Sequence, residues 1–186
     1  MNKYWQNSIT FDEYIKETER RIEVQNPEDD HNEYYELGLQ RMNRTLKTFK
    51  IDEEQLNVLK SKNFTGKILI ISEPWCGDAS ATVPAVTKFF EAANVEVKIF
   101  LKDSDHSLIE QFLTNGTQSI PKILILNENF EVKNVWGPRP KFGNDLLKKF
   151  KENPETYPRE EFYNDLQVYY AKNRGKDAIT ELLELL

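Results

Sequence analysis

The chain has 186 residues, with 25 Lys and Arg against 31 Asp and Glu, and so a net charge of −6. Its 39% of hydrophobic residues, with only 7 Gly and 8 Pro, exclude a disordered or fibrous protein. The acidic balance argues against nucleic acid as a partner, and no apolar stretch approaches the roughly 20 residues that cross a bilayer. Because the N-terminus also lacks the apolar core of a signal peptide, we expect a cytoplasmic protein without a membrane partner.

The region before residue 64 is predicted to be helical. Thr10 followed by Glu13 is a capping-box start, and the helix that it begins ends before Pro27. Asp52 with Gln55 begins a short later helix. Between them, spacings of four and three residues predict an amphipathic helix with the apolar residues Tyr35, Leu39, Met42, Leu46 and Phe49. We interpret these stripes as packing surfaces, and residues 1–63 as an extension packed on the core.

After Gly66 the period of the apolar residues changes from that of helices to that of strands. A continuous apolar run and an alternating one predict two parallel strands, each followed by a helix. Two further strands joined by a short turn predict an antiparallel hairpin before a closing helix. The expected order is strand 67–71, helix 78–93, strand 95–101, helix 108–113, strands 122–126 and 131–136, and helix 144–152.

The last part of the chain, residues 153–186, is predicted to be helical again. One apolar stripe reaches Tyr169, Gly175 interrupts the pattern, and a second stripe ends at Leu186. We expect this extension to pack on the core, although its apolar end would also suit a partner protein. The sequence leaves the oligomeric state open.

The chain contains one cysteine, Cys76. A single thiol cannot form an internal disulfide, build a cysteine-based zinc site or complete a dithiol cycle. Any redox chemistry therefore needs a second molecule, and we expect neither a metal nor an organic cofactor. The two histidines, His31 and His106, lie in polar stretches without metal-ligand spacing and are interpreted as ordinary surface residues.

A cysteine directly after the first strand and at the start of a helix, in this order of elements, is the arrangement of the thioredoxin fold. Trp75-Cys76-Gly77 resembles the start of the thioredoxin motif Trp-Cys-Gly-x-Cys, and Pro84 matches the proline that kinks the helix of that motif. The resemblance covers about residues 64–152 and points to a bacterial branch of poorly defined role. It implies a thioredoxin-like α/β fold, with a central mixed sheet flanked by helices and a helical extension at each end.

The resemblance also implies a substrate groove beside Cys76. Ile120-Pro121 looks like the family's cis-proline site, and Gly137 matches the glycine that completes the substrate-facing surface. The implied groove comprises Trp75, Gly77, Asp78, Ile120, Pro121, Gly137 and Arg139. Arg139 would reach a substrate carboxylate or thiolate, or else be exposed without a role. Trp136 would serve as a second aromatic wall, although core packing is the stronger interpretation.

Two departures from the family argue against ordinary dithiol reductase activity. Ala79 stands where thioredoxins have the resolving cysteine, and Ile70 stands where they bury an aspartate that serves that second thiol. The absence of the aspartate is consistent with the absence of the resolving cysteine, because a buried carboxylate that assists no thiol would only destabilise the fold.

The remaining thiol is expected to be accessible and acidic. At a helix N-terminus the partial positive charge lowers the pKa of a cysteine below its free value of about 8.5. The carboxylate of Asp78 works against this shift. A structural, chemically idle cysteine is the alternative.

Two functions follow from these residues. The leading hypothesis is monothiol thiol-disulfide exchange through Cys76 with a protein or low-molecular-weight thiol or disulfide partner. The alternative is a redox-idle protein-interaction module that holds extended peptide segments through backbone hydrogen bonds next to Pro121. A shared iron-sulfur cluster, as in monothiol glutaredoxins, is disfavoured because the chain lacks their Cys-Gly-Phe-Ser string. The reactivity of Cys76 separates the first two hypotheses.

Overall fold

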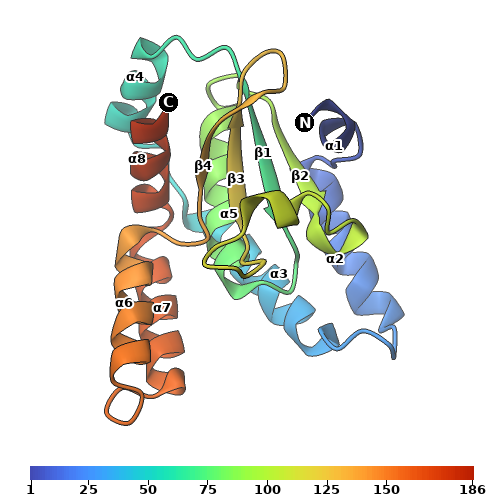
Figure 1. Ribbon diagram of the computed structural model, residues 1–186, viewed down its shortest axis with the longest axis vertical. Coiled ribbons are helices and arrows are strands. Elements are labelled where there is room, and N and C mark those ends of the chain that lie inside the picture. The colour runs from blue at the N-terminus through green and yellow to red at the C-terminus, as the bar shows by residue number, and fades with distance from the viewer.

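The computed structural model describes all 186 residues and has a four-stranded sheet at its centre, with helices packed around it (Figure 1). Strand β1 (Lys67–Ser72) pairs in parallel with β2 (Val97–Leu101) and antiparallel with β3 (Lys122–Leu126). Strand β4 (Val132–Trp136) completes the predicted hairpin with β3, so the strand order is β2-β1-β3-β4. The expected central mixed sheet flanked by helices is confirmed.

Helices make up most of the remaining chain. The capping box at Thr10 is confirmed, and the carboxylate of Asp52 caps the next predicted helix start by accepting from two backbone N–H groups. None of the helices combines the length and the hydropathy that crossing a bilayer requires. Their bounds are α1 (Asn2–Gln6), α2 (Phe11–Val24), α3 (Asn32–Thr48), α4 (Glu53–Ser61), α5 (Gly77–Glu91), α6 (Lys141–Glu152), α7 (Arg159–Asn173) and α8 (Lys176–Leu185).

The helix expected over 108–113 does not form. This connection between β2 and β3 contains only the short 3-10 helices η1 (Lys102–Ser104) and η2 (Ile109–Phe112). Leu108 and Ile109 are buried, so the apolar pattern correctly marked packing residues. The segment buries these side chains through a short 3-10 helix, a common connector, instead of an α-helix.

One continuous hydrophobic core joins the sheet to both ends of the chain. Its 32 buried residues include Tyr14 and Met42 from the N-terminal helices and Ile179 and Leu182 from α8. Helix α3 packs on α5, and α4 packs on α8. A second, smaller core of Tyr157, Phe162, Leu166 and Tyr170 is completed by apolar residues of α6, so that α6 and α7 form a lobe beside the sheet (Figure 1).

The residues before α2 extend the sheet beyond β2. Ile9 forms an isolated antiparallel bridge with Ile99, in which each N–H donates to the other residue's carbonyl at 2.9 and 2.8 Å. Tyr4 and Trp5 of α1 are buried nearby, and Tyr4 packs edge-to-face on Phe100 of β2. The N-terminus therefore covers part of the outer edge of β2.

Helix α3 approaches the loop between β1 and α5 so closely that only glycine fits at position 38. A Cβ on Gly38 would lie 2.6 Å from the carbonyl oxygen of Pro74, a backbone atom that cannot rotate away. We expect Gly38→Ala to lower the free energy of unfolding by about 1–3 kcal/mol, the usual cost of overpacking, despite the better helix propensity of alanine. Urea unfolding should show no such loss for Asn43→Ala, an exposed position on the same helix. A Gly38→Ala protein of wild-type stability would mean that α3 can move away from the loop without cost.

Candidate functional site

Cys76 is the N-cap residue of α5 and lies against the segment that precedes Pro121. Its thiol donates to the carbonyl oxygen of Ile120 at 3.4 Å, and the Ile120–Pro121 peptide bond is cis. Ala79 is fully buried one turn further along α5, and Ile70 is fully buried in β1. The structure thus brings Cys76 and the Ile120–Pro121 segment together, as the resemblance implies.

The environment of the thiol differs from the expected one. Cys76 is only 8% exposed. Burial raises the pKa of the thiol to about 12, the charge of Asp78 acts in the same direction, and the N–H groups of Ala79 and Asp78 oppose both. The expectation of an accessible thiol with a lowered pKa is therefore wrong, because lost hydration outweighs the effect of the helix N-terminus.

Asp78 forms a buried ion pair beside the cysteine. Arg139 donates from Nη2 to its carboxylate at 2.6 Å, and the hydroxyl of Tyr170 donates to the other oxygen at 2.7 Å. Burial raises the pKa of Asp78, and both partners oppose that rise. Arg139 was expected to be free for a substrate or exposed, but its side chain is 16% exposed and engaged by Asp78.

A second buried carboxylate, Glu73, connects the loop before Cys76 to the N-terminal helices. Its oxygens accept from Nη1 of Arg21 in α2 at 2.8 Å and from the N–H of Asp103 at 2.7 Å. Burial raises the pKa of Glu73, whereas the Asp103 N–H and the Arg21 charge lower it. No motif or period in the sequence marks this residue.

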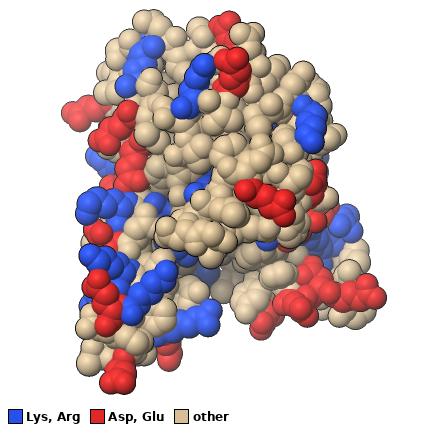
Figure 2. Space-filling model, in the orientation of Figure 1, with Lys and Arg blue, Asp and Glu red and all other residues tan.

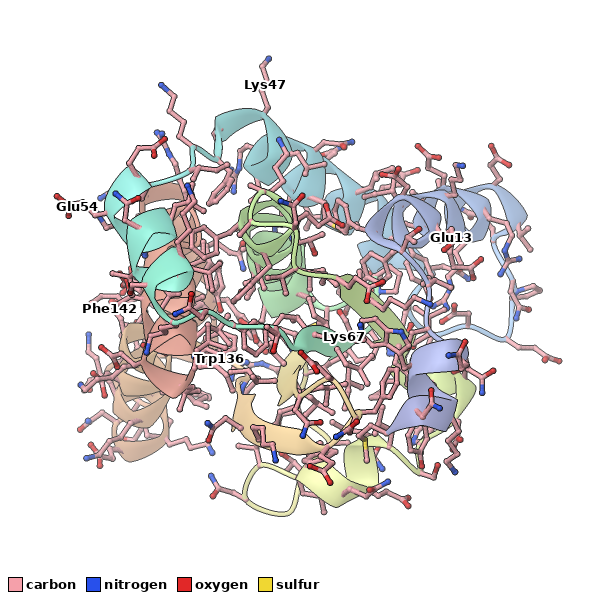
Figure 3. The ribbon with its side chains drawn as sticks, turned by 90° about the horizontal axis from the view of Figure 1, so that it is seen from above. Glu13, Lys47, Glu54, Lys67, Trp136 and Phe142 are labelled. Atoms are coloured by element: carbon pink, nitrogen blue, oxygen red, sulfur yellow. The ribbon has the colours of Figure 1, made fainter.

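Trp75 is held in place by polar and aromatic contacts. Its indole N–H donates to the carboxylate of Asp103 at 2.9 Å, and its ring stacks on His31 with a centroid distance of 4.3 Å. His31 is 39% exposed, as expected of a surface residue, and its ring in addition packs on Trp75. Trp136, by contrast, is buried at the β4 edge of the sheet near α8, where its indole N–H donates to Glu181 at 2.7 Å (Figure 3).

A cleft of about 560 Å³ opens next to Cys76, and we call it the Cys76 cleft. Two of the expected groove residues, Pro121 and Gly137, do not line it. Gly137 packs behind it, where an added Cβ would lie 2.3 Å from the carbonyl oxygen of Pro121. The expected residues that line the cleft together with Cys76 are Trp75, Gly77, Asp78, Ile120 and Arg139.

The two walls of the Cys76 cleft come from the terminal regions of the chain, which sequence reasoning did not connect with the site. Helix α3 forms one wall and α7 the other. Figure 2 shows a hollow between the lobe of α6 and α7 and the lobe that contains the turn between α2 and α3. The wall residues are His31, Tyr34, Leu37, Gly38 and Arg41 on one side, and Arg159, Tyr163, Leu166 and Gln167 on the other.

The floor of the cleft offers free backbone groups. Neither the N–H of Ile120 nor the carbonyl of Ser119 takes part in a hydrogen bond. An extended chain in the cleft would pair with such groups as an added strand does. No group of three or more His, Cys, Asp and Glu side chains lies close enough together to hold a metal ion.

Comparisons with known proteins show the family and the fold of the chain. Residues 24–151 match a family model described as thioredoxin, so α3 lies inside the match and α7 outside it. A protein of unknown function from Pseudomonas aeruginosa has a similar structure, with TM-score 0.61, 19% identity and coverage of 80% of this chain and 83% of that one. An HIV epitope-scaffold also has a similar structure, with TM-score 0.59, 19% identity and coverage of 80% and 84%. These two likenesses show the fold alone, and no curated protein sequence gives a significant match.

Proposed function

The chain belongs to the thioredoxin family, and we propose that its Cys76 cleft binds an extended segment of a partner protein. We propose further that Cys76 is redox-idle. The observation that carries this proposal is the state of the thiol. Its sulfur is buried, donates to the Ile120 carbonyl and lies near a carboxylate that disfavours a second negative charge. A thiol in these surroundings is a weak nucleophile at neutral pH.

The cleft itself supports the binding role. Apolar and aromatic side chains from both walls are unusually exposed there, with Tyr34 at 47%, Leu37 at 44% and Tyr163 at 44%. Aromatic side chains beside a groove are common anchors for a partner. The free backbone groups of Ser119 and Ile120 would supply hydrogen bonds to an extended chain between these walls.

The reactivity of Cys76 tests the proposal first. With a pKa of about 12, the thiolate fraction at pH 7.5 is on the order of 10³-fold lower than for a free cysteine, and alkylation by iodoacetamide should slow accordingly. The rate should still be rising at about pH 10, whereas the urea-unfolded protein should titrate near 8.5. A midpoint below 8.5 in the folded protein would refute the idle thiol.

The second test measures whether peptides still bind when the sulfur of Cys76 is removed. Peptides selected on the wild-type protein from a random heptapeptide library should bind Cys76→Ser with similar affinity. Tyr163→Ala, which removes an exposed ring from the wall, should weaken them by roughly tenfold. If the selected peptides lose all affinity for Cys76→Ser, their binding depends on the thiol of Cys76, and the proposed sulfur-independent binding is wrong.

Monothiol exchange remains the second candidate, and the position of Cys76 in the lining of the cleft favours it. In that reaction the Cys76 thiolate attacks a partner disulfide, one new S–S bond forms, and one partner sulfur leaves as a thiolate. A thiol of a second molecule then attacks the mixed disulfide and releases Cys76. A mixed disulfide that forms at Cys76 with an oxidised peptide at neutral pH would favour this function over the redox-idle one.

A further inference from the structure

We propose that the segment bound in the Cys76 cleft is acidic and that Arg41, together with Arg44 and Arg159, recognises its carboxylates. This inference rests on the proposed function and specifies the chemistry of the partner. It rests on the charge of the cleft, the surroundings of Arg41 and the length of the groove.

The charge of the cleft is opposite to that of the molecule. The chain carries a net charge of −6, yet three arginines, Arg41, Arg139 and Arg159, line the cleft against one carboxylate, Asp78. Because Arg139 already neutralises Asp78, the other two guanidinium groups remain without an acidic partner. Such local positive charge in an acidic protein is complementary to an anionic ligand.

Arg41 is the central member of this group. It is half-buried and makes no hydrogen bond or ion pair, while Arg159 contacts Tyr163 alone, donating to its hydroxyl at 3.4 Å and lying 5.4 Å from its ring centroid. Burial lowers the pKa of Arg41, and the neighbouring charge of Arg44 adds to that effect. A carboxylate placed beside Arg41 would therefore satisfy a partly desolvated cation that the protein leaves unpaired.

The space next to Arg41 is open because position 77 has no side chain. An added Cβ on Gly77 would lie 3.4 Å from Nη1 of Arg41 and 3.8 Å from Nε2 of Gln167. The Oε1 atom of Gln167 is buried without a hydrogen-bond partner. Nη1 of Arg41 and Nε2 of Gln167 thus face the same open space, where both can donate to a peptide with an acidic side chain, while Oε1 of Gln167 stays buried behind them.

The groove is long enough for an extended chain. A neighbouring hollow of about 480 Å³ shares Leu37, Arg41 and Gln167 with the Cys76 cleft and adds Arg44. Each hollow alone has the volume of a small-ligand pocket, so their continuity favours a peptide. Arg41 and Arg44 are neighbours on α3, about 5–6 Å apart at Cβ, and alternate residues of a strand are about 6.6 Å apart. We therefore expect acidic side chains at alternate positions of the peptide.

Selection from a random heptapeptide library tests the inference. Peptides bound by the wild-type protein should contain several times more Asp and Glu than the input library, against the repulsion expected from a net charge of −6. For a selected peptide, Arg41→Gln should raise Kd about tenfold, which corresponds to about 1.4 kcal/mol, and replacing the peptide's Glu residues by Gln should raise Kd at least as much. Arg20→Gln is the matched control, since Arg20 is exposed on α2 and does not line the cleft.

The outcomes separate this inference from the proposed function. Selected peptides without acidic enrichment, or an Arg41→Gln protein that keeps its fold by circular dichroism and its full affinity, would overturn the acidic partner while leaving peptide binding intact. Failure to select any peptide would contradict the proposed function itself. Displacement of the selected peptide by citrate at a similar concentration would identify a small anion as the occupant and also overturn the inference.

Discussion

Replacing Glu73 by alanine should lower the free energy of unfolding by about 3 kcal/mol, near the lower end of the cost of removing one partner from a buried ion pair. Glu73 is fully buried, and its loss leaves the 18% exposed guanidinium of Arg21 without this partner. The N–H of Asp103 also loses its acceptor. The loss stays near the lower end because Arg21 keeps a second carboxylate, Glu17, at 2.8 Å. Urea unfolding followed by circular dichroism measures the change.

Two matched variants show whether burial is responsible for the effect of Glu73. Glu73→Gln should lose less than Glu73→Ala, since an amide oxygen still accepts from the Asp103 N–H. Asp145→Asn breaks the exposed pair with Lys141 and should cost less than about 1 kcal/mol. If Glu73→Ala is no less stable than Asp145→Asn, the N-terminal helices are not anchored to the Cys76 loop through this pair.

Replacing Arg139 by alanine should cost about 3–5 kcal/mol at neutral pH, because it leaves the charge of Asp78 buried with only the Tyr170 hydroxyl as a partner. The cost should depend on pH. Burial already raises the pKa of Asp78 in the folded protein, and without Arg139 nothing charged opposes that rise. A raised folded-state pKa means that stability is lost as pH rises through it, so the deficit should be largest at neutral pH and shrink on acidification. Unfolding measured between about pH 4 and 7 tests this dependence.

Removing both charges separates the ion pair from simple packing at Arg139. The double variant Asp78→Asn with Arg139→Met should be more stable than Arg139→Ala alone, since no unpaired charge stays buried. Arg159→Ala in the same cleft removes a guanidinium without an acidic partner and should change stability by no more than about 0.5 kcal/mol. Equal stability of Arg139→Ala and Arg159→Ala would show that the Asp78–Arg139 pair does not hold α5 to the loop between β4 and α6.

The sheet was predictable because the period of side chains reports directly on which faces are buried. The run of apolar residues at 67–71 becomes β1, whose inner residues are fully buried, and the turn after residue 126 sets the hairpin. Helix starts were predictable where a side chain caps them, as at Thr10 and Asp52. The α-helix predicted over 108–113 was wrong because its apolar residues are buried by a short 3-10 helix, and burial alone does not reveal which kind of helix forms.

The candidate site was predictable only where a motif marked it. Cys76 and Ile120 were placed together through the resemblance, but the pKa of the thiol depends on how completely distant helices cover it, which no local pattern shows. Arg41 and Tyr163 lie in segments whose pattern indicates packing helices, and the opening between those helices is a tertiary property. The burial of Glu73 could not be predicted, because a single charged residue in a loop belongs to no helical or strand pattern.

The bridge between Ile9 and Ile99 protects the sheet against association with the sheets of other copies of this protein. An open sheet ends in two outer strands whose unpaired backbone groups invite self-association and fibril growth. Here the N-terminus blocks part of the edge at β2, and the edge at β4 has a register irregularity opposite Ile125 and Leu126 and carries the charged Lys133. Free strand-pairing groups at Ser119 and Ile120 are instead recessed between two helical walls. A single flexible chain can reach them there, whereas the broad edge of a second sheet cannot.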